Sequence, residues 1–199
     1  MRHLILSLLL IPVAASLQAQ GRFGIKGGTN IFYLSSDPDV TKEYINPKPG
    51  DVALGFTLGA CYMMKINDVV SIQPEFNISQ QRARSYNGTI NMTYSQVPVF
   101  LQFHPGKAPV GIYVGPQLNF LNGLKVDYYK SSSVSGRDGY VYTDFGIGWG
   151  VGTRPKNKGL MVDFRVYNGL SNVVRAVYDN GNKSRQNVYT VTFGYLFKK

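Results

Sequence analysis

The final stretch of the chain, residues 187–197, constrains the fold more than any other segment. Its large residues fall at every second position, which on a β-strand places their side chains on one face. These residues are Tyr189, Val191, Phe193, Tyr195 and Phe197, and those between them are smaller and partly polar. Aromatic residues at both ends of an apolar face are typical of a strand that contacts lipid in its middle and the membrane interface at its ends. The pattern therefore predicts a transmembrane β-strand.

The opposite end of the chain predicts export. Arg2 precedes a short apolar run at residues 4–13, and Ala19 follows it as a small residue at a cleavage position. This arrangement is typical of a secretory signal peptide. The alternative, a transmembrane helix, needs about 20 apolar residues, more than this run contains. We expect a signal peptide at residues 1–19 and one domain at residues 20–199.

Alternation with a period of two recurs along the whole mature chain, and no segment shows a helical period. Gly is frequent, with 22 residues, and Tyr and Phe contribute 14 and 11. Eight stretches alternate: residues 23–33, 52–65, 69–80, 90–103, 110–121, 140–153, 159–167 and 187–197. In each stretch one of the two alternating sets of positions carries the larger apolar residues. In the middle of the stretches this bulky phase holds Phe56, Leu58, Val99, Ile112, Ile147 and Phe164, and Val166 is on the same phase of its stretch. We expect this phase to face lipid.

The connections between these stretches alternate in length. Residues 66–68, 104–109 and 154–158 form short connections, whereas residues 34–51, 81–89, 122–139 and 168–186 are longer and polar. An even number of strands with short turns at one end and long loops at the other is the pattern of an outer-membrane barrel. The sequence predicts an all-β fold, an eight-stranded antiparallel up-and-down transmembrane β-barrel with short periplasmic turns and longer extracellular loops.

Three prolines, Pro74, Pro98 and Pro116, lie inside these stretches. Proline removes a hydrogen bond from the ladder and is unusual within a sheet. Because the alternation continues through each proline, we keep the strands and expect a local bulge at each position.

Several segments together resemble a known family. They are RFGIKGGTN at residues 22–30, SIQPEFNISQ at 71–80, YSQVPVFLQF at 94–103, YVGPQLNFL at 113–121 and the terminal FGYLF. The ordered set resembles the porin-family, PorT-like outer-membrane β-barrel proteins, and so implies a small barrel like outer-membrane proteins A and X. The chain departs from such proteins at Gln96, where they often have an acidic residue.

The resemblance implies integral outer-membrane localisation, with outer-membrane lipids and the barrel-assembly machinery as partners. It implies no catalytic residues, and the word porin in the family label does not imply an open pore. The aromatic end of the chain resembles the terminal signature by which such barrels are recognised for insertion. We therefore expect Tyr189, Phe193, Tyr195 and Phe197 to form a C-terminal assembly strand.

Catalytic, metal and cofactor sites find little support in the residues themselves. His104 is the one histidine after the predicted cleavage point, and it lies in a predicted turn, where we expect it to be exposed to solvent. A histidine-based metal site needs more ligands than this. The glycines of GIGWGVG at residues 146–152 continue an alternating strand and open no helix, so they do not predict a phosphate loop. We expect no enzymatic activity, no cofactor and no metal, and we expect these glycines to relieve crowding inside the barrel.

Charged residues on the smaller, polar phase of the strands predict an interior network. They are Lys26, Glu75, Asp144, Asp163 and Arg165. The interior of an eight-stranded barrel is just wide enough for side chains to fill. These residues therefore predict either a plug of ion pairs and amides or a gated path for ions.

The chain has a formal net charge of +10, and so basic a chain can indicate nucleic-acid binding. Here the basic residues instead gather at the predicted periplasmic ends of the strands: Arg22, Lys65, Lys107, Arg154, Lys156, Lys158, Lys198 and Lys199, opposed by Asp68. A cationic rim beside anionic headgroups explains this distribution, so we expect no nucleic-acid partner.

Three functions remain open from the sequence. The first is a structural or surface-interaction role for the extracellular loops, with a loop partner that the sequence does not identify. The second is a narrow channel for ions or small solutes. The third is a soluble lipocalin-like carrier with its apolar faces turned inward.

Overall fold

The computed structural model describes residues 21–36, 53–85, 88–105, 108–128, 134–135, 140–153, 159–173 and 184–198. The predicted signal peptide and its cleavage point lie outside these residues. So do Lys107, Arg154, Lys156, Lys158 and Lys199 of the predicted cationic rim. No helix in the described part of the chain is long and apolar enough to cross a bilayer.

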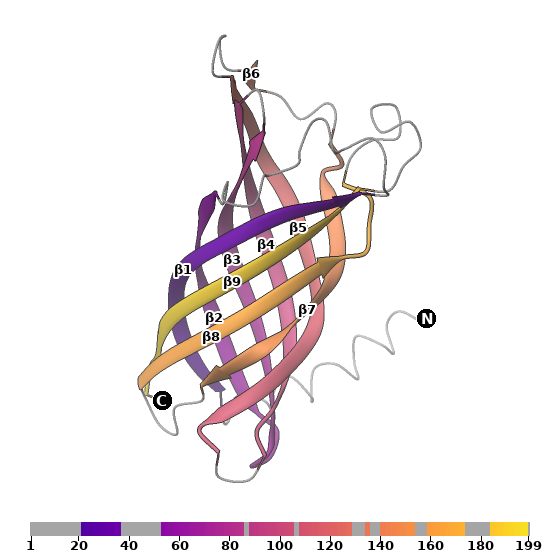
Figure 1. The fold of residues 1–199 in the computed structure, drawn as a ribbon. Helices are drawn as coiled ribbons and strands as arrows, with labels where there is room; N and C mark the ends of the chain where they lie inside the picture. The colour runs from indigo at the N-terminus through magenta and orange to yellow at the C-terminus, as the bar shows by residue number, and fades with distance from the viewer. Residues whose placement is uncertain are drawn as a thin grey trace, which may run out of the picture.

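Eight long antiparallel strands form a closed ring (Figure 1). They are β1 (Gly21–Ser36), β2 (Leu54–Lys65), β3 (Val70–Ser85), β4 (Gly88–Phe103), β5 (Val110–Tyr128), β7 (Thr143–Thr153), β8 (Gly159–Gly169) and β9 (Ser184–Leu196). Neighbours in the chain pair with one another, and β9 closes the ring against β1 from Gly24↔Leu196 to Ser36↔Ser184. A two-residue strand, β6 (Val134–Ser135), pairs with the end of β5. The predicted eight-stranded up-and-down barrel is confirmed.

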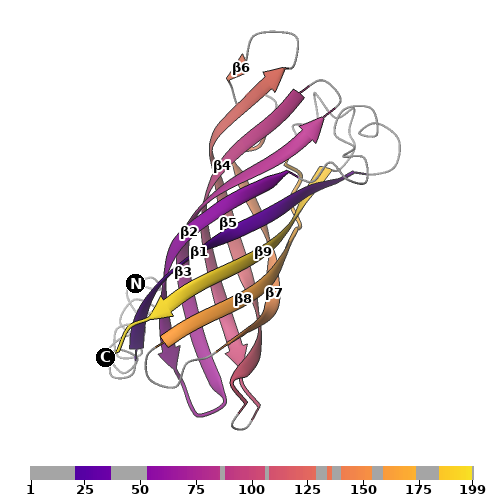
Figure 2. The ribbon, with the colours of Figure 1, turned by 60° about the vertical axis from the view of Figure 1, so that its left-hand side comes forward.

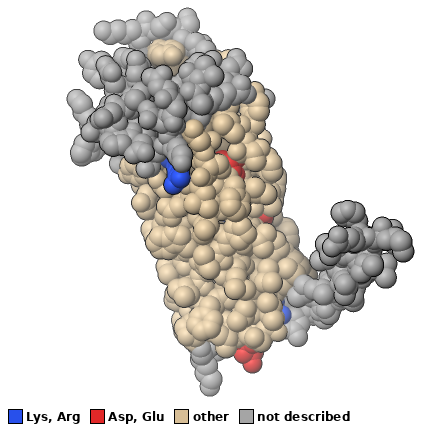
Figure 3. Space-filling view, turned by 90° about the vertical axis from the view of Figure 1, so that its right-hand side faces the viewer, with Lys and Arg blue, Asp and Glu red and all other residues tan. Residues whose placement is uncertain are grey.

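The apolar phase of the strands lies on the outside of the barrel. The six mid-strand residues predicted to face lipid are between 40% and 70% exposed. Figure 3 shows one side of the barrel, most of it free of charged side chains. A soluble carrier would turn this apolar surface inward, so the carrier alternative is wrong.

One residue of the predicted lipid face behaves differently. Val166 was expected on the outer surface, but it is buried. It lies in register between Trp149 on β7 and Tyr189 on β9, two large side chains that flank it. The strand phase gives the direction of a side chain, whereas its exposure also depends on the size of its neighbours.

Aromatic pairs mark both ends of the apolar surface. Near the ends of β1 and β9, the rings of Phe23 and Phe197 stack with their centroids 6.1 Å apart. At the opposite end of the same two strands, Tyr33 and Tyr189 meet edge to face at 5.8 Å. Such aromatic girdles flank the hydrocarbon region in membrane barrels.

The prolines do not produce the predicted bulges. β4 and β5 keep one register on both sides of Pro98, from Pro98↔Gln117 to Leu101↔Val114. Around the prolines on β3 and β4, a few residues drop out of the ladder and the same pairing then resumes. The register shift lies instead between Thr93 and Tyr94, where Asn122 is the extra residue on β5. A missing ladder bond is therefore tolerated without inserting a residue.

The strands run further at the extracellular end than the sequence predicted. Residues 81–89 were expected to form a long loop, but β3 continues to Ser85 and β4 begins at Gly88. β5 likewise continues to Tyr128, and β6 lies at the tip of the end that projects furthest in Figure 1. Figure 2 shows these strands from a second direction.

Polarity inverts in this extracellular part. Its interior is a cluster of apolar side chains, which we call the extracellular cluster: Phe32, Ala83, Ile90, Met92, Tyr94, Leu121, Tyr167 and Val188. Its outer face carries polar side chains, among them Gln80, Arg82 and Asn91. A polar outside and an apolar inside are what water on the outside favours, so the inversion marks where the strands leave the apolar belt.

Candidate functional site

Four charged side chains of the described residues gather inside the barrel, at mid-height. β1 contributes Lys26, β3 contributes Glu75, and β8 contributes Asp163 and Arg165. Since β3 and β8 are four strands apart in a ring of eight, they form opposite walls. Arg165 reaches across the lumen, so these four residues form one cluster, which we call the ion cluster.

Short contacts connect the members of the ion cluster. Arg165 binds Glu75 with both ends of its guanidinium, at 2.6 Å from Nη1 to Oε2 and 2.7 Å from Nη2 to Oε1. Its Nη2 also donates to Asp163 Oδ2 at 2.9 Å. Lys26 forms an ion pair with Glu75, and its Nζ lies 3.9 Å from Asp163. All four residues are at most 8% exposed, and two cations face two carboxylates, so the buried charges balance.

Amide side chains complete the environment of Glu75. Gln73 donates to Glu75 Oε1 at 2.6 Å, and Asn77 donates to Oε2 at 3.2 Å. Gln102 on β4 donates to Gln73 at 2.9 Å. The carboxylate is thus surrounded by donors, which is what a buried charge requires. Alternation along residues 69–80 and 90–103 puts Gln73, Asn77 and Gln102 on the same phase as Glu75, but nothing in the sequence indicates that they contact one another.

Two aromatic rings hold the guanidinium of Arg165. Its Cζ lies 4.6 Å from the ring centroid of Phe100 and 5.0 Å from that of Tyr113. Arg165 Nε also donates to the Tyr113 hydroxyl at 3.1 Å. These cation–π contacts fix the planar group across the lumen. Neither ring was predicted from the sequence as part of this site; the signal that could have identified them was their place on the interior phase of β4 and β5.

Glycines on β7 provide the space for these rings. A Cβ on Gly148 would lie 2.8 Å from a ring carbon of Phe100. A Cβ on Gly152 would collide with Asp163 Oδ1 and would lie 3.0 Å from a ring carbon of Tyr113. A side chain at Gly148 would therefore displace the Phe100 ring, and one at Gly152 would displace the Asp163 carboxylate and crowd the Tyr113 ring. This agrees with the expectation that the glycines of residues 146–152 relieve crowding.

Asp144 does not join the ion cluster, although the sequence grouped it with the other four residues. It lies nearer the extracellular end, where Asn119 donates to its Oδ2 at 3.1 Å and Ser171 donates to its Oδ1 at 3.0 Å. Tyr167 and Gln186 also donate to it. The strand phase directs Asp144 into the lumen, but its height along the barrel places it in a separate layer of amides and hydroxyls.

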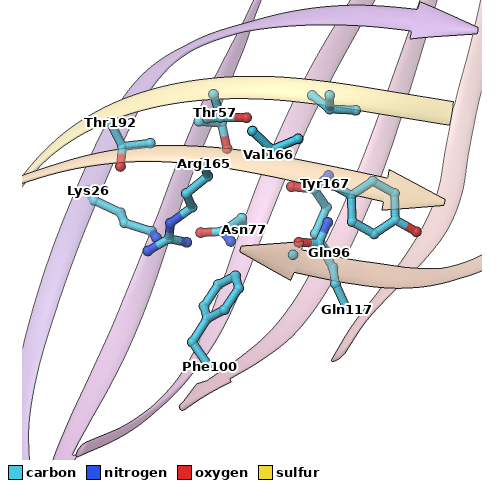
Figure 4. Close-up of a pocket in the computed structure, with 13 residues that line it drawn as sticks. Lys26, Thr57, Asn77, Gln96, Phe100, Gln117, Arg165, Val166, Tyr167 and Thr192 are labelled. Atoms are coloured by element: carbon cyan, nitrogen blue, oxygen red, sulfur yellow. The ribbon is translucent and has the colours of Figure 1, made fainter. Parts of the chain in front are cut away.

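Little empty space remains between these layers. A cavity of about 30 Å³ lies beside the ion cluster, and its lining includes Lys26, Asn77, Phe100, Gln117 and Arg165 (Figure 4). Because one water needs about 10–15 Å³ of such space, this cavity has room for about two or three waters. Toward the periplasmic end the lumen holds a second apolar cluster of Cys61, Met63, Met161 and Leu196. Side chains of the described residues therefore occupy the lumen at each of these levels.

His104 is buried, not exposed as predicted. Its backbone N–H donates to Val69 O at 2.7 Å, which ties it to the start of β3. Its ring lies over Gly111, where a Cβ would collide with it. The absence of a side chain at Gly111 thus gives the imidazole a place inside the barrel mouth. No group of three or more His, Cys, Asp or Glu residues in the described chain is arranged to hold a metal ion.

The C-terminal strand lies where the sequence put it. Tyr189, Phe193 and Tyr195 are on the outer face of β9 and are exposed, and Phe197 follows directly after the strand. The Phe197 N–H donates to Phe23 O at 2.8 Å, which continues the closure of the ring beyond Leu196. The geometry does not test a role in assembly.

Comparison with known proteins identifies this chain as an outer-membrane β-barrel. The sequence model of a family described as outer membrane protein beta-barrel domain matches residues 4–197. A search of curated proteins finds no match.

Solved structures give the same fold. Ail, the attachment invasion locus protein of Yersinia pestis, in complex with the heparin analogue sucrose octasulfate, is similar with a TM-score of 0.51 and 16% identity. That match covers 89% of this chain and 99% of Ail. Neisserial surface protein A is similar with a TM-score of 0.50 and 16% identity over 86% of this chain and 95% of its own.

Proposed function

Because the chain belongs to the outer membrane protein beta-barrel domain family, we propose that it is an integral outer-membrane barrel with a closed lumen. Its role is structural or one of interaction at the cell surface. Its partners are then the outer-membrane lipids, the machinery that assembles barrels, and a loop partner on the extracellular side. The proposal includes no enzymatic activity.

One observation carries the closed lumen: the two-point ion pair of Arg165 with Glu75 joins opposite walls at mid-height. An ion crossing the barrel would have to displace this pair or squeeze past it. Since breaking a buried pair leaves an uncompensated charge in a site of low polarity, the pair is costly to open. The small volume of the cavity beside it, about 30 Å³, supports a closed lumen.

A surface-interaction role is supported by the extracellular architecture. β3, β4 and β5 extend beyond the apolar belt and present polar side chains on a regular sheet. Ail is an attachment protein and was solved with a heparin analogue, and Neisserial surface protein A is a surface protein. We propose a surface-interaction role of this kind for the present chain, but we do not propose that it binds the partners of those two proteins.

Conductance in planar lipid bilayers tests the proposal. We expect the wild-type protein to insert without producing conductance steps. Glu75→Gln and Arg165→Met are measured beside it, because each variant leaves an unpaired charge in the lumen. Steps in the wild type would replace the proposal with the second candidate, a narrow channel for ions or small solutes. The polar side chains that line the cavity beside the ion cluster are the observation that favours this second candidate.

Steps that appear only in the two variants would indicate a gate formed by the same pair. Silence in all three proteins, with folded insertion shown by protease protection, would support a permanent plug.

A further inference from the structure

A polar groove lies on the outer face of the extracellular extension. It has a volume of about 480 Å³ and crosses β3, β4 and β5. Arg82 pairs with Asn91, and Asn91 pairs with Lys125, so these three residues form one row across the three strands. Neighbouring strands are roughly 4.8 Å apart, which puts the backbones of Arg82 and Lys125 about 10 Å from each other.

The floor of the groove is open because of Gly123. Gly123 is in register with Thr93 one row below the basic row, and a Cβ built on it meets no atom within 4 Å. It directly follows Asn122, the extra residue of the β5 bulge. The bulge and the glycine together hollow this face of the sheet.

The groove begins where the apolar belt ends. Ile78, Val97 and Phe120 are exposed apolar residues on the same three strands, and the next outward positions are polar. Arg82 marks this boundary, since its Cζ lies 5.7 Å from the ring centroid of exposed Phe56. If the apolar belt spans the hydrocarbon core of the membrane, residues at this level lie among the lipid headgroups of the outer leaflet.

The charges in the groove leave one cation uncommitted. Lys125 forms an ion pair with Asp127 at 2.8 Å, and Asn91 donates to the same carboxylate at 3.0 Å. Among the described residues, Arg82 makes one long hydrogen bond, of 3.5 Å to Gln80, besides its contact with the Phe56 ring, and its buried Nε has no hydrogen-bond partner. With Arg82 and Lys125 positive and Asp127 negative, the groove carries a net charge of +1. A guanidinium with free donors is suited to a phosphate.

We propose that this groove binds the phosphorylated headgroup of an outer-leaflet glycolipid, with Arg82 and Lys125 donating to the phosphate. Asn91, Thr93 and Gln80 supply the hydrogen-bonding groups that a sugar requires, and the acyl chains lie along the apolar belt below. The inference goes beyond the closed barrel proposed above and depends only on the barrel spanning the membrane. A bound lipid would hold the protein at a fixed depth and orientation in the outer leaflet.

The test uses the full mature chain in phosphatidylcholine nanodiscs that contain a small fraction of lipid A, a phosphorylated glycolipid. Lipid A retained per protein is measured by mass spectrometry, beside a dephosphorylated lipid A. We expect wild-type protein to enrich the phosphorylated form, and Arg82→Gln and Lys125→Gln each to weaken retention about fivefold. Gly123→Leu should weaken it without changing any charge, because the side chain fills the groove.

Lys65→Gln is the matched control. Lys65 is also an exposed lysine paired with a nearby carboxylate, Asp68, but it lies at the periplasmic end. It should retain lipid A as the wild type does, and folding of every variant is checked by the shift in gel mobility on heating.

Equal retention by the wild type, Arg82→Gln and Gly123→Leu would overturn the proposal, as would equal enrichment of dephosphorylated lipid A. Glucose 6-phosphate is added as a soluble competitor. If glucose 6-phosphate and inorganic phosphate displace lipid A at the same concentration, the groove is a site for free anions. That result would also overturn the proposal.

Discussion

Replacing Glu75 by Gln removes the charge on which the ion cluster is centred. Arg165 contacts this carboxylate at 2.6 and 2.7 Å, and Lys26 forms an ion pair with it. The cluster contains two cations and two carboxylates, so Glu75→Gln leaves a net charge of +1 inside the barrel. Arg165→Met leaves −1, and the double variant restores balance.

The structure sets the size of the expected effects. Removing one partner of a buried pair costs about 3–5 kcal/mol. In Glu75→Gln the guanidinium keeps its contact of 2.9 Å with Asp163, so we expect the lower end, about 3 kcal/mol. In Arg165→Met the carboxylate keeps Lys26, and the loss should be similar. The double variant should lose about 4 kcal/mol in place of about 6, a coupling of about 2 kcal/mol.

Urea unfolding of the refolded chain in lipid vesicles measures these losses. The sequence contains one tryptophan, Trp149, which lies exposed on the outer face of β7, so its fluorescence reports transfer between lipid and water. Lys65→Met and Asp68→Asn give a control cycle on an exposed pair, where the coupling should stay below about 1 kcal/mol. Strictly additive losses for Glu75 and Arg165 would refute the reasoning, because they would mean that the two side chains do not interact.

Other predictions follow from the outer face, the terminus and the lumen glycines. Val99→Arg should destabilise the barrel by about 2–4 kcal/mol in the same unfolding assay, whereas Arg at exposed Ser135 should be neutral; equal tolerance would contradict the lipid-facing assignment. Phe197→Ala should lower the yield of heat-modifiable protein in the outer-membrane fraction while leaving export intact, and an unchanged yield would remove the assembly role of this residue. Gly152→Val should cost about 1–3 kcal/mol by displacing the Asp163 carboxylate and crowding the Tyr113 ring, and wild-type unfolding of that variant would show that the lumen can relax.

Local alternation was enough to predict the strands and the direction of most side chains. A period of two decides which residues face inward, so it placed Lys26, Glu75, Asp163 and Arg165 in the lumen. Opposite walls followed from strand order in a closed ring of eight, which made the meeting of Glu75 and Arg165 predictable. These inferences need no knowledge of register.

Features that depend on height along the barrel could not be predicted in this way. Asp144 has the right phase for the ion cluster but lies in another layer, because the pairing of β7 with β5 and β8 fixes its level. The extension of β3 and β4 was missed because its outer residues, such as Arg82, are polar and resemble a loop. There the inner face is apolar, so the expected rule of apolar outside and polar inside no longer applied. The burial of His104 depended on Gly111, a neighbour on another strand.

The glycines of β7 have a consequence for how this lumen can change over evolutionary time. Phe100 and Tyr113 occupy volume that Gly148 and Gly152 leave vacant on β7, and Asp163 fills the same space beside Gly152. A larger residue at Gly148 is therefore tolerated only together with a smaller one at position 100, whereas a larger residue at Gly152 would also have to displace the Asp163 carboxylate. We expect homologous chains to vary at Gly148 and Phe100 as a compensating pair and to keep Gly152 where they keep Asp163, so that the total volume within the lumen stays nearly constant.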